Sequence, residues 1–141
     1  MRRIAAANGV VSVCVWDYAG GMEFLRRFWD SVAAVDARAA ELDEGRRFPI
    51  CRPDALKSLL REGGLDDVIC DSIEIPTRVS TFAELWKPFL GGTGPAPSYV
   101  ASLDSPQREA LATRLERSLP REPDGAISLV ASAWVVRGIA R

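Results

Sequence analysis

The sequence predicts an α/β fold in which every strand can share one sheet. Its elements are expected in the order strand, helix, helix, strand, two or three helices, strand. Hydrophobic residues make up 48% and charged residues 26% of the 141 residues, a balance typical of globular proteins. A chain of this length can bury roughly 68–70% of its unfolded surface. We therefore expect a single domain over residues 1–141.

The first strand is expected at residues 10–16, after a turn at Asn8-Gly9. This segment is rich in β-branched residues and apolar on both faces, as in a strand buried within a sheet. A loop over residues 17–21 leaves its carboxyl end. Apolar residues then recur at three- and four-residue steps, which predicts an amphipathic helix from Met22 to about Leu42. Its solvent side is expected to carry Arg26, Arg27, Asp30 and Asp36.

The remaining elements are bounded by turn and capping residues. After a connector at residues 46–49, Pro53 begins a helix that Gly63-Gly64 ends, and a strand follows at residues 68–75. The capping-box spacing from Thr81 to Glu84 predicts a short helix that stops at residues 91–95. A helix capped by Ser105-Pro106 and a last strand at residues 127–136 complete the chain.

Composition excludes several classes of function. The chain has no histidine, so Ser-His-Asp and Cys-His catalysis and histidine metal sites are excluded. Its three cysteines lack CxxC spacing, so we expect no metal site and no disulfide, and reduced thiols in a cytoplasmic protein. A net charge of -1 argues against nucleic-acid binding. No apolar run reaches the roughly 20 residues of a membrane span.

Six segments, taken together in order, carry a family resemblance. They are residues 9–18 (GVVSVCVWDY), Phe28-Trp29, residues 46–49 (RRFP) with residues 51–53 (CRP), Gly64-Leu65, residues 86–92 (WKPFLGG) and residues 133–138 (AWVVRG). In this order and spacing the chain resembles the C-terminal half of a class I S-adenosylmethionine-dependent methyltransferase. The resemblance is to the small-molecule branch called methyltransferase type 11.

The resemblance implies the C-terminal part of a Rossmann-like fold. Residues 10–16, 68–75 and 127–136 would be the fifth, sixth and seventh strands of the family. They would form a three-stranded mixed sheet, with the last strand central and antiparallel and with helices packed on the sheet. The resemblance also implies methyl transfer to a small molecule, with S-adenosylmethionine as cofactor.

The cofactor motifs of the family precede this region, and none of them is found in this chain. We therefore assign no cofactor-binding residue and expect the chain alone to bind S-adenosylmethionine weakly or not at all. The protein would be truncated, or would need a separate N-terminal half.

Two groups of residues are candidates for contact with the substrate. Trp16, Asp17 and Tyr18 follow a central strand at its carboxyl end, where open α/β sheets place ligands. Alternatively, Trp16 is a core residue, Asp17 caps the turn and Tyr18 covers the sheet edge. Trp86, Phe89 and Tyr99 form the second group, because the family builds its substrate lid between the sixth and seventh strands. Alternatively, the helical spacing of Phe82, Trp86 and Phe89 is typical of core packing.

Catalytic residues are not assigned, because no carboxylate has a partner at chemical spacing. Arg46-Arg47 could clamp an anion or simply be solvated. The alternative function is a non-catalytic binding or assembly module. Its motive is the open edge of the strand at residues 10–16, which could pair two copies into a homodimer. The segment of residues 1–7 could instead fold back over that edge.

Overall fold

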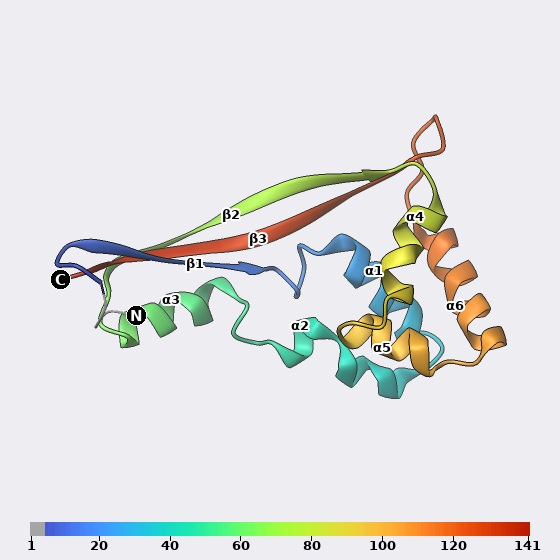
Figure 1. The fold of residues 1–141 in the computed structure, drawn as a ribbon, viewed down its shortest axis with the longest axis horizontal. Coiled ribbons are helices and arrows are strands. Elements are labelled where there is room, and N and C mark those ends of the chain that lie inside the picture. The colour runs from blue at the N-terminus through green and yellow to red at the C-terminus, as the bar shows by residue number, and fades with distance from the viewer. Residues whose placement is uncertain (1–4) are drawn as a thin grey trace.

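A computed structural model describes residues 5–141. Its sheet contains β1 (Gly9–Trp16), β2 (Asp66–Val79) and β3 (Ile127–Ala140) in the order β1-β3-β2. β3 is central and antiparallel to both neighbours, as predicted (Figure 1). The sheet is not mixed, because β1 and β2 run in the same direction but are not neighbours. Every strand pair is therefore antiparallel.

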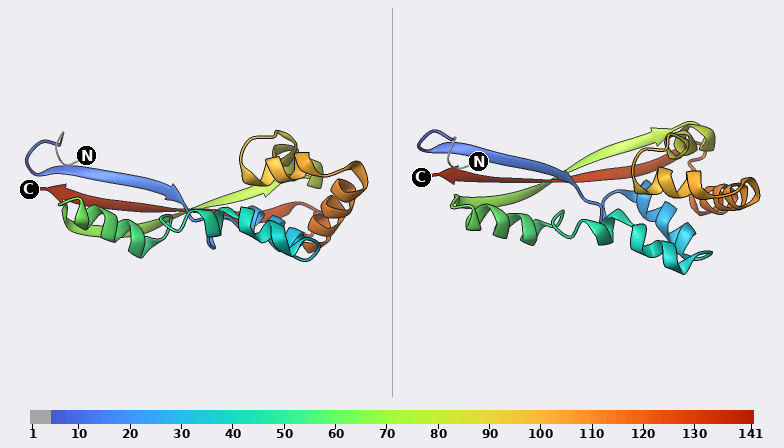
Figure 2. Two further views of the ribbon diagram at one scale, coloured as in Figure 1. Left: turned by 90° about the horizontal axis from the view of Figure 1, so that it is seen from below. Right: turned by 60° about the horizontal axis from the view of Figure 1, so that its bottom comes forward.

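β2 and β3 form a long antiparallel two-stranded ribbon, and β1 pairs with only part of it. β1 lies along the C-terminal half of β3, from Trp16 opposite Ala133 to Gly9 opposite Ala140. β2 extends to Val79 rather than ending at residue 75, although it contains Pro76. A proline is tolerated there because β2 is an edge strand. The ribbon of β2 and β3 twists along its length and projects beyond the end of β1 (Figure 2).

The predicted helix from Met22 to about Leu42 is divided at Asp36, and a further short helix follows Asp43. α1 spans Glu23–Ala33, and the 3₁₀ helix η2 (Ala37–Leu42) begins where the Asp36 side chain accepts the N–H groups of the next turn. The short helix α2 (Glu44–Arg47) begins at Asp43, which accepts the N–H of Gly45. A side-chain cap offers the backbone an alternative to continuing the helix. The continuous helix was therefore a wrong prediction.

The later helices follow the predicted order with one addition. α3 (Pro53–Glu62) begins at its proline, and α4 (Phe82–Trp86) continues into the 3₁₀ helix η3 (Lys87–Leu90). α6 (Ser105–Ser118) is capped by Asp104, not Ser105, through a capping box with Gln107. α5 (Pro95–Ser102) was not predicted, because its prolines and flanking glycines resemble a loop. Pro95 nevertheless has the fixed φ that suits a first helical turn.

Two hydrophobic clusters lie on opposite faces of the sheet. The larger cluster packs α1, α5 and α6 against Ile127, Leu129 and Ala131 of β3. The smaller cluster packs α3 against Val136 and Ala140 of the same strand. The side of β3 that is buried therefore changes between the two ends of the strand. The two helix groups lie at opposite ends of the ribbon formed by β2 and β3 (Figure 1).

One face of the sheet stays open beside β1, opposite the face that α3 covers. We call its side chains the open face. They are Val10, Ser12, Cys14 and Trp16 of β1, Ile69, Asp71 and Ile73 of β2, and Val135, Arg137 and Ile139 of β3. Val10 is 61% exposed, Ile73 49% and Trp16 40%. Contiguous exposed apolar surface of this kind marks interaction sites in soluble proteins.

Candidate functional site

The turn after β1 is closed by the carboxylate of Asp17. Its two oxygens accept the N–H groups of Gly20 at 3.2 Å and Gly21 at 2.9 Å. A Cβ at Gly21 would lie 2.4 Å from the Cβ of Ser132, so this turn packs directly on β3. Asp17 thus shapes the turn at the carboxyl end of β1, in agreement with the alternative reading of this residue.

Trp16 and Tyr18 leave the turn in different surroundings. Trp16 belongs to the open face, opposite Ala133, and is not a core residue. Tyr18 packs against the large cluster, and its ring centroid lies 5.7 Å from that of Phe48. Burial raises the pKa of the Tyr18 phenol, and the charges of Cys51 and Glu44 raise it further. Tyr18 is therefore neutral and packed near physiological pH.

A hollow of about 560 Å³ lies beside this turn. It is lined by Asp17, Ala19 and Gly20, by residues 52–55 at the start of α3, and by Trp134. The indole Nε1 of Trp134 is buried and has no hydrogen-bond partner among residues 5–141. The hollow brings one predicted residue, Asp17, next to residues that the sequence did not single out.

Two of the predicted aromatic residues belong to a continuous packed group. Phe89 is only 2% exposed and stacks on Phe28 with ring centroids 4.6 Å apart. Trp86 packs on Phe89 at 5.5 Å and on Phe82 at 5.9 Å. Neither Trp86 nor Phe89 lines the hollows described in this section. Both residues are placed to stabilise the helical end of the molecule.

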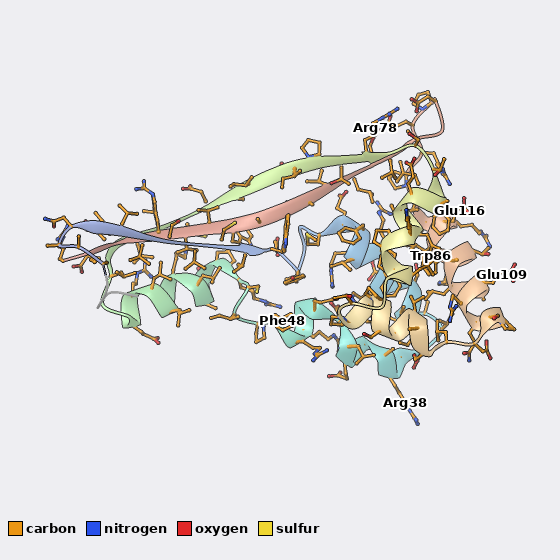
Figure 3. The ribbon with its side chains drawn as sticks, in the orientation of Figure 1. Arg38, Phe48, Arg78, Trp86, Glu109 and Glu116 are labelled. Atoms are coloured by element: carbon orange, nitrogen blue, oxygen red, sulfur yellow. The ribbon has the colours of Figure 1, made fainter. Side chains whose placement is uncertain are left out.

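Tyr99 lies near a second hollow, of about 510 Å³, between α5 and the end of α2. Its hydroxyl donates to Asp36 Oδ2 at 3.3 Å. Leu42, Arg47 and Phe48 form the opposite wall. Phe48 lies in the connector between α2 and α3 (Figure 3) and contacts Tyr18 on its other side. Phe48 thus contacts Tyr18 and lines the same hollow as Tyr99.

The walls of this second hollow depend on an ion pair between α1 and α2. Arg26 donates two hydrogen bonds to Asp43, and the indole of Trp29 donates to Glu44. Burial alone would raise the pKa of Asp43, but the bonds from Arg26 and Gly45 and the nearby positive charges lower it below its usual value. The prediction that Arg26 lies on a solvent-facing side is wrong, since its guanidinium joins two helices.

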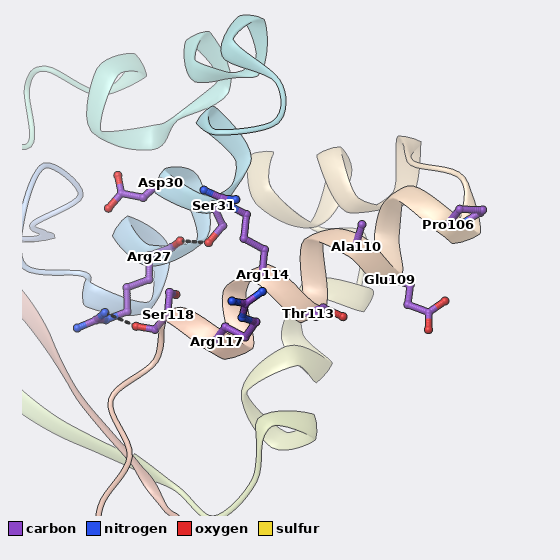
Figure 4. A pocket seen from close by; sticks show the side chains of 10 residues that line it. All are labelled: Arg27, Asp30, Ser31, Pro106, Glu109, Ala110, Thr113, Arg114, Arg117 and Ser118. Atoms are coloured by element: carbon purple, nitrogen blue, oxygen red, sulfur yellow. Dashed lines mark hydrogen bonds between the residues drawn. The ribbon is translucent and has the colours of Figure 1, made fainter.

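A larger groove, of about 900 Å³, is lined by residues of α1 and α6 (Figure 4). Arg27 spans one end of the groove and donates to the carbonyl of Ser118 at 2.7 Å. Arg114 and Arg117 of α6 also line it, together with Asp30 and Glu109. None of the six predicted substrate residues lies in this groove.

The glycine turns of the described residues differ from the turn that holds a nucleoside cofactor such as S-adenosylmethionine. A nucleoside cofactor in an open α/β fold needs a glycine turn after a strand, with free amides at a helix start. Here the amides of Gly20 and Gly21 are already bonded to Asp17. The segment of residues 91–94 follows η3 rather than a strand. Residues 5–141 also contain no cluster of three or more metal-ligating His, Cys, Asp or Glu side chains.

Two lining residues, Phe48 and Trp134, were missed as candidates for contact with a ligand. Trp134 lies inside a strand. Its place beside the start of α3 depends on how the strands pair, which the local sequence does not specify. Phe48 stood in a segment that read as a plain connector. Arg47, considered only as part of an anion clamp, lies on the same wall as Phe48.

No family model matches this chain, and no curated protein sequence matches it. In the part of the chain that the structure describes, no helix combines the length and the apolar character needed to cross a bilayer.

Proposed function

We propose that this chain is the C-terminal unit of a Rossmann-like methyltransferase and acts on a small molecule once a separate N-terminal half supplies the S-adenosylmethionine site. The observation that carries the proposal is the strand order β1-β3-β2 with an antiparallel central strand. The resemblance implied this order for the last three strands of the family, and local sequence patterns do not fix it.

The joint with such a half would be the outer edge of β1. Within residues 5–141, this edge has no strand beside it. The open face adjoins it, with Val10 and Trp16 exposed on the same strand. A strand with a covering helix would satisfy both surfaces, because the backbone edge needs a ladder and the apolar side chains need cover.

The residues of this chain would then bind and orient the substrate. Tyr99, Phe48 and Arg47 line a hollow with aromatic and cationic walls, of a size suited to a small organic molecule. The turn at Asp17 would hold the carboxyl end of β1 in place beside the cofactor half. No proton-transfer residue is assigned, because the described carboxylates in these hollows form no pair at chemical distance.

The cofactor part of the proposal is tested by titration calorimetry with S-adenosylmethionine. The chain alone should show no binding tighter than about 100 μM, equivalent to roughly 5.5 kcal/mol. Tighter binding would mean that the cofactor site lies within this chain. The partner part is tested in the DNA upstream of Met1 and in neighbouring genes. A strand–glycine turn–helix segment there supports the proposal, and its absence from both places overturns it.

A second candidate function is a non-catalytic assembly module that self-associates through the same edge. The observation in its favour is that the eight residues of β1 contain neither a charge nor a proline. Natural edge strands usually carry such residues to prevent pairing. Light scattering at micromolar concentration tests this candidate, because the module is a homodimer when purified alone.

A further inference from the structure

We propose that two copies of this chain pair β1 against β1, antiparallel, about a two-fold axis through Val13. This inference rests on the second proposed function and specifies its partner and its register. The product is a continuous six-stranded sheet in which each β1 is central. The following observations carry it.

The direction of the backbone groups in β1 follows from one printed bond. The N–H of Asp17 donates to the carbonyl of Ser132 at 2.9 Å. Bonded and non-bonded pairs alternate along an antiparallel ladder, so Val15, Val13 and Val11 direct their groups toward β3. The remaining positions, Val10, Ser12, Cys14 and Trp16, therefore direct their N–H and C=O groups to the outer edge.

The two edges of the sheet differ in how they treat incoming strands. β2 carries Pro76, the charges of Asp71, Glu74 and Arg78, and an irregular register near Asp66. Each of these discourages pairing. β1 has none of them over its whole length. Because both edges belong to one chain, the contrast indicates that β1 is the edge that takes a partner strand.

The sequence of β1 is complementary to itself in one register. Outward groups must face outward groups, and an axis at Val13 is the one that pairs all four outward positions of β1. Val10 then lies opposite Trp16 of the second copy, and Ser12 lies opposite Cys14. Val10 and Trp16 are exposed by 61% and 40% in the single chain, so each covers the other on the open face.

The other face of β1 also admits a second copy. Val11, Val13 and Val15 are half-buried and would form a ladder of valines across the axis. α3 makes its main contacts with β2 and β3, and its cluster meets these valines on the face of the sheet rather than at the outer edge of β1. Within residues 5–141 no strand lies along the outer side of β1 (Figure 2). Residues 1–4, part of the segment that could fold back over this edge, lie outside the described residues. No charge lies on β1 to oppose the approach.

Cysteine cross-linking tests the register in a Cys14→Ser background, which removes the exposed native thiol. Val13→Cys places two thiols in a non-bonded pair with Cα atoms about 4.5 Å apart, a distance that a disulfide bridges. The matched control Val11→Cys places its two copies about 13 Å apart, four residues along the strand. We expect a covalent dimer on mild oxidation of the first variant and none of the second.

A charge swap tests the same pair without oxidation. Ser12→Glu with Cys14→Glu sets like charges opposite each other in the dimer, whereas Ser12→Glu with Cys14→Lys sets opposite charges there. Arg137, opposite Ser12 within the chain, accommodates the glutamate in both variants. The first should raise the dimer dissociation constant at least tenfold over the second, by light scattering, with equal circular dichroism spectra.

Three outcomes overturn the inference. A wild-type chain that stays monomeric at micromolar concentration removes both the dimer and the assembly function. A dimer in which Val13→Cys fails to cross-link, or in which Val11→Cys cross-links as well, retains self-association but rejects this register. Titration with S-adenosylmethionine is independent of all three, so failure of the methyltransferase proposal is recognised separately.

Discussion

Arg26 of α1 and Asp43 of α2 are joined through two hydrogen bonds, one of them 2.7 Å from Nη1 to Oδ2. Asp43 also accepts the N–H of Gly45 at 2.8 Å, so one carboxylate begins α2 and ties it to α1. The next residue, Glu44, accepts the indole N–H of Trp29. Both acidic residues at the start of α2 are thus bonded to α1.

Arg26→Ala should lower the free energy of unfolding by about 1–3 kcal/mol. The reason is that Asp43 would remain mostly buried, with the N–H of Gly45 as its remaining bonded donor. Urea unfolding measures the loss. Arg38→Ala is the control, because Arg38 is exposed and its substitution removes the same charge. Equal losses in the two variants would contradict a specific role for the ion pair.

Acid should destabilise the wild-type protein more than it destabilises Asp43→Asn. The pKa of Asp43 is lowered in the folded state, and the unfolded value is about 3.9. The unfolded chain therefore takes up this proton first, and the stability that the ionised group contributes is present above pH 4 and is lost as pH falls below it. Thermal melts from pH 6 to pH 2.5 should show a shallower decline for Asp43→Asn. Parallel curves would refute the assignment.

Gly21→Ala should destabilise the turn after β1 by about 1–3 kcal/mol. The added methyl would lie 2.4 Å from the Cβ of Ser132. Ser132→Gly removes that atom, so the double variant should regain part of the loss, and a double-mutant cycle measures the coupling. Gly92→Ala is not a matched control, since its φ is positive, whereas Gly20→Ala meets only Asp17 Oδ2 at 3.6 Å. Additive losses would show that the close approach is not limiting.

Phe89→Ala should cost about 3–5 kcal/mol, because a fully buried ring is replaced by a cavity. Trp86→Ala should cost less, since the Trp86 ring is only half-buried. Both values come from urea unfolding. A larger loss for Trp86 than for Phe89 would mean that the packed group is centred on α4 rather than on η3.

The sequence was most informative where one residue type controls one local choice. The three strands, the start of α3 at Pro53 and the central antiparallel place of β3 all agree with expectation. The strand order depended on the resemblance, because alternation assigns a face to each residue but no neighbour to each strand. The division of the long helix was missed because Asp36 occupies a polar position that a surface helix also tolerates.

The candidate site was less predictable than the fold. Asp17 could be placed at the end of a strand, but its bonds to Gly20 and Gly21 depend on the path of the loop. Phe89 and Tyr99 were both candidates for contact with the substrate, yet Phe89 is enclosed by aromatic rings while Tyr99 borders a hollow with Phe48. The difference arises because Tyr99 belongs to α5, a helix whose prolines and flanking glycines are typical of a loop.

The change of buried side along β3 divides the protein into two cooperative units of unequal size. Ile127 and Leu129 of β3 pack in the large helical cluster and should unfold with it, while Val136 and Ala140 pack against α3 and should unfold with that helix. Because the smaller unit has one covering helix, it should open at a lower free energy, and its amides should exchange with solvent sooner. β1 belongs to that less stable unit. A strand bound at the outer edge of β1 would therefore slow amide exchange at the α3 end of the ribbon formed by β2 and β3, and would leave amide exchange at the other end unchanged.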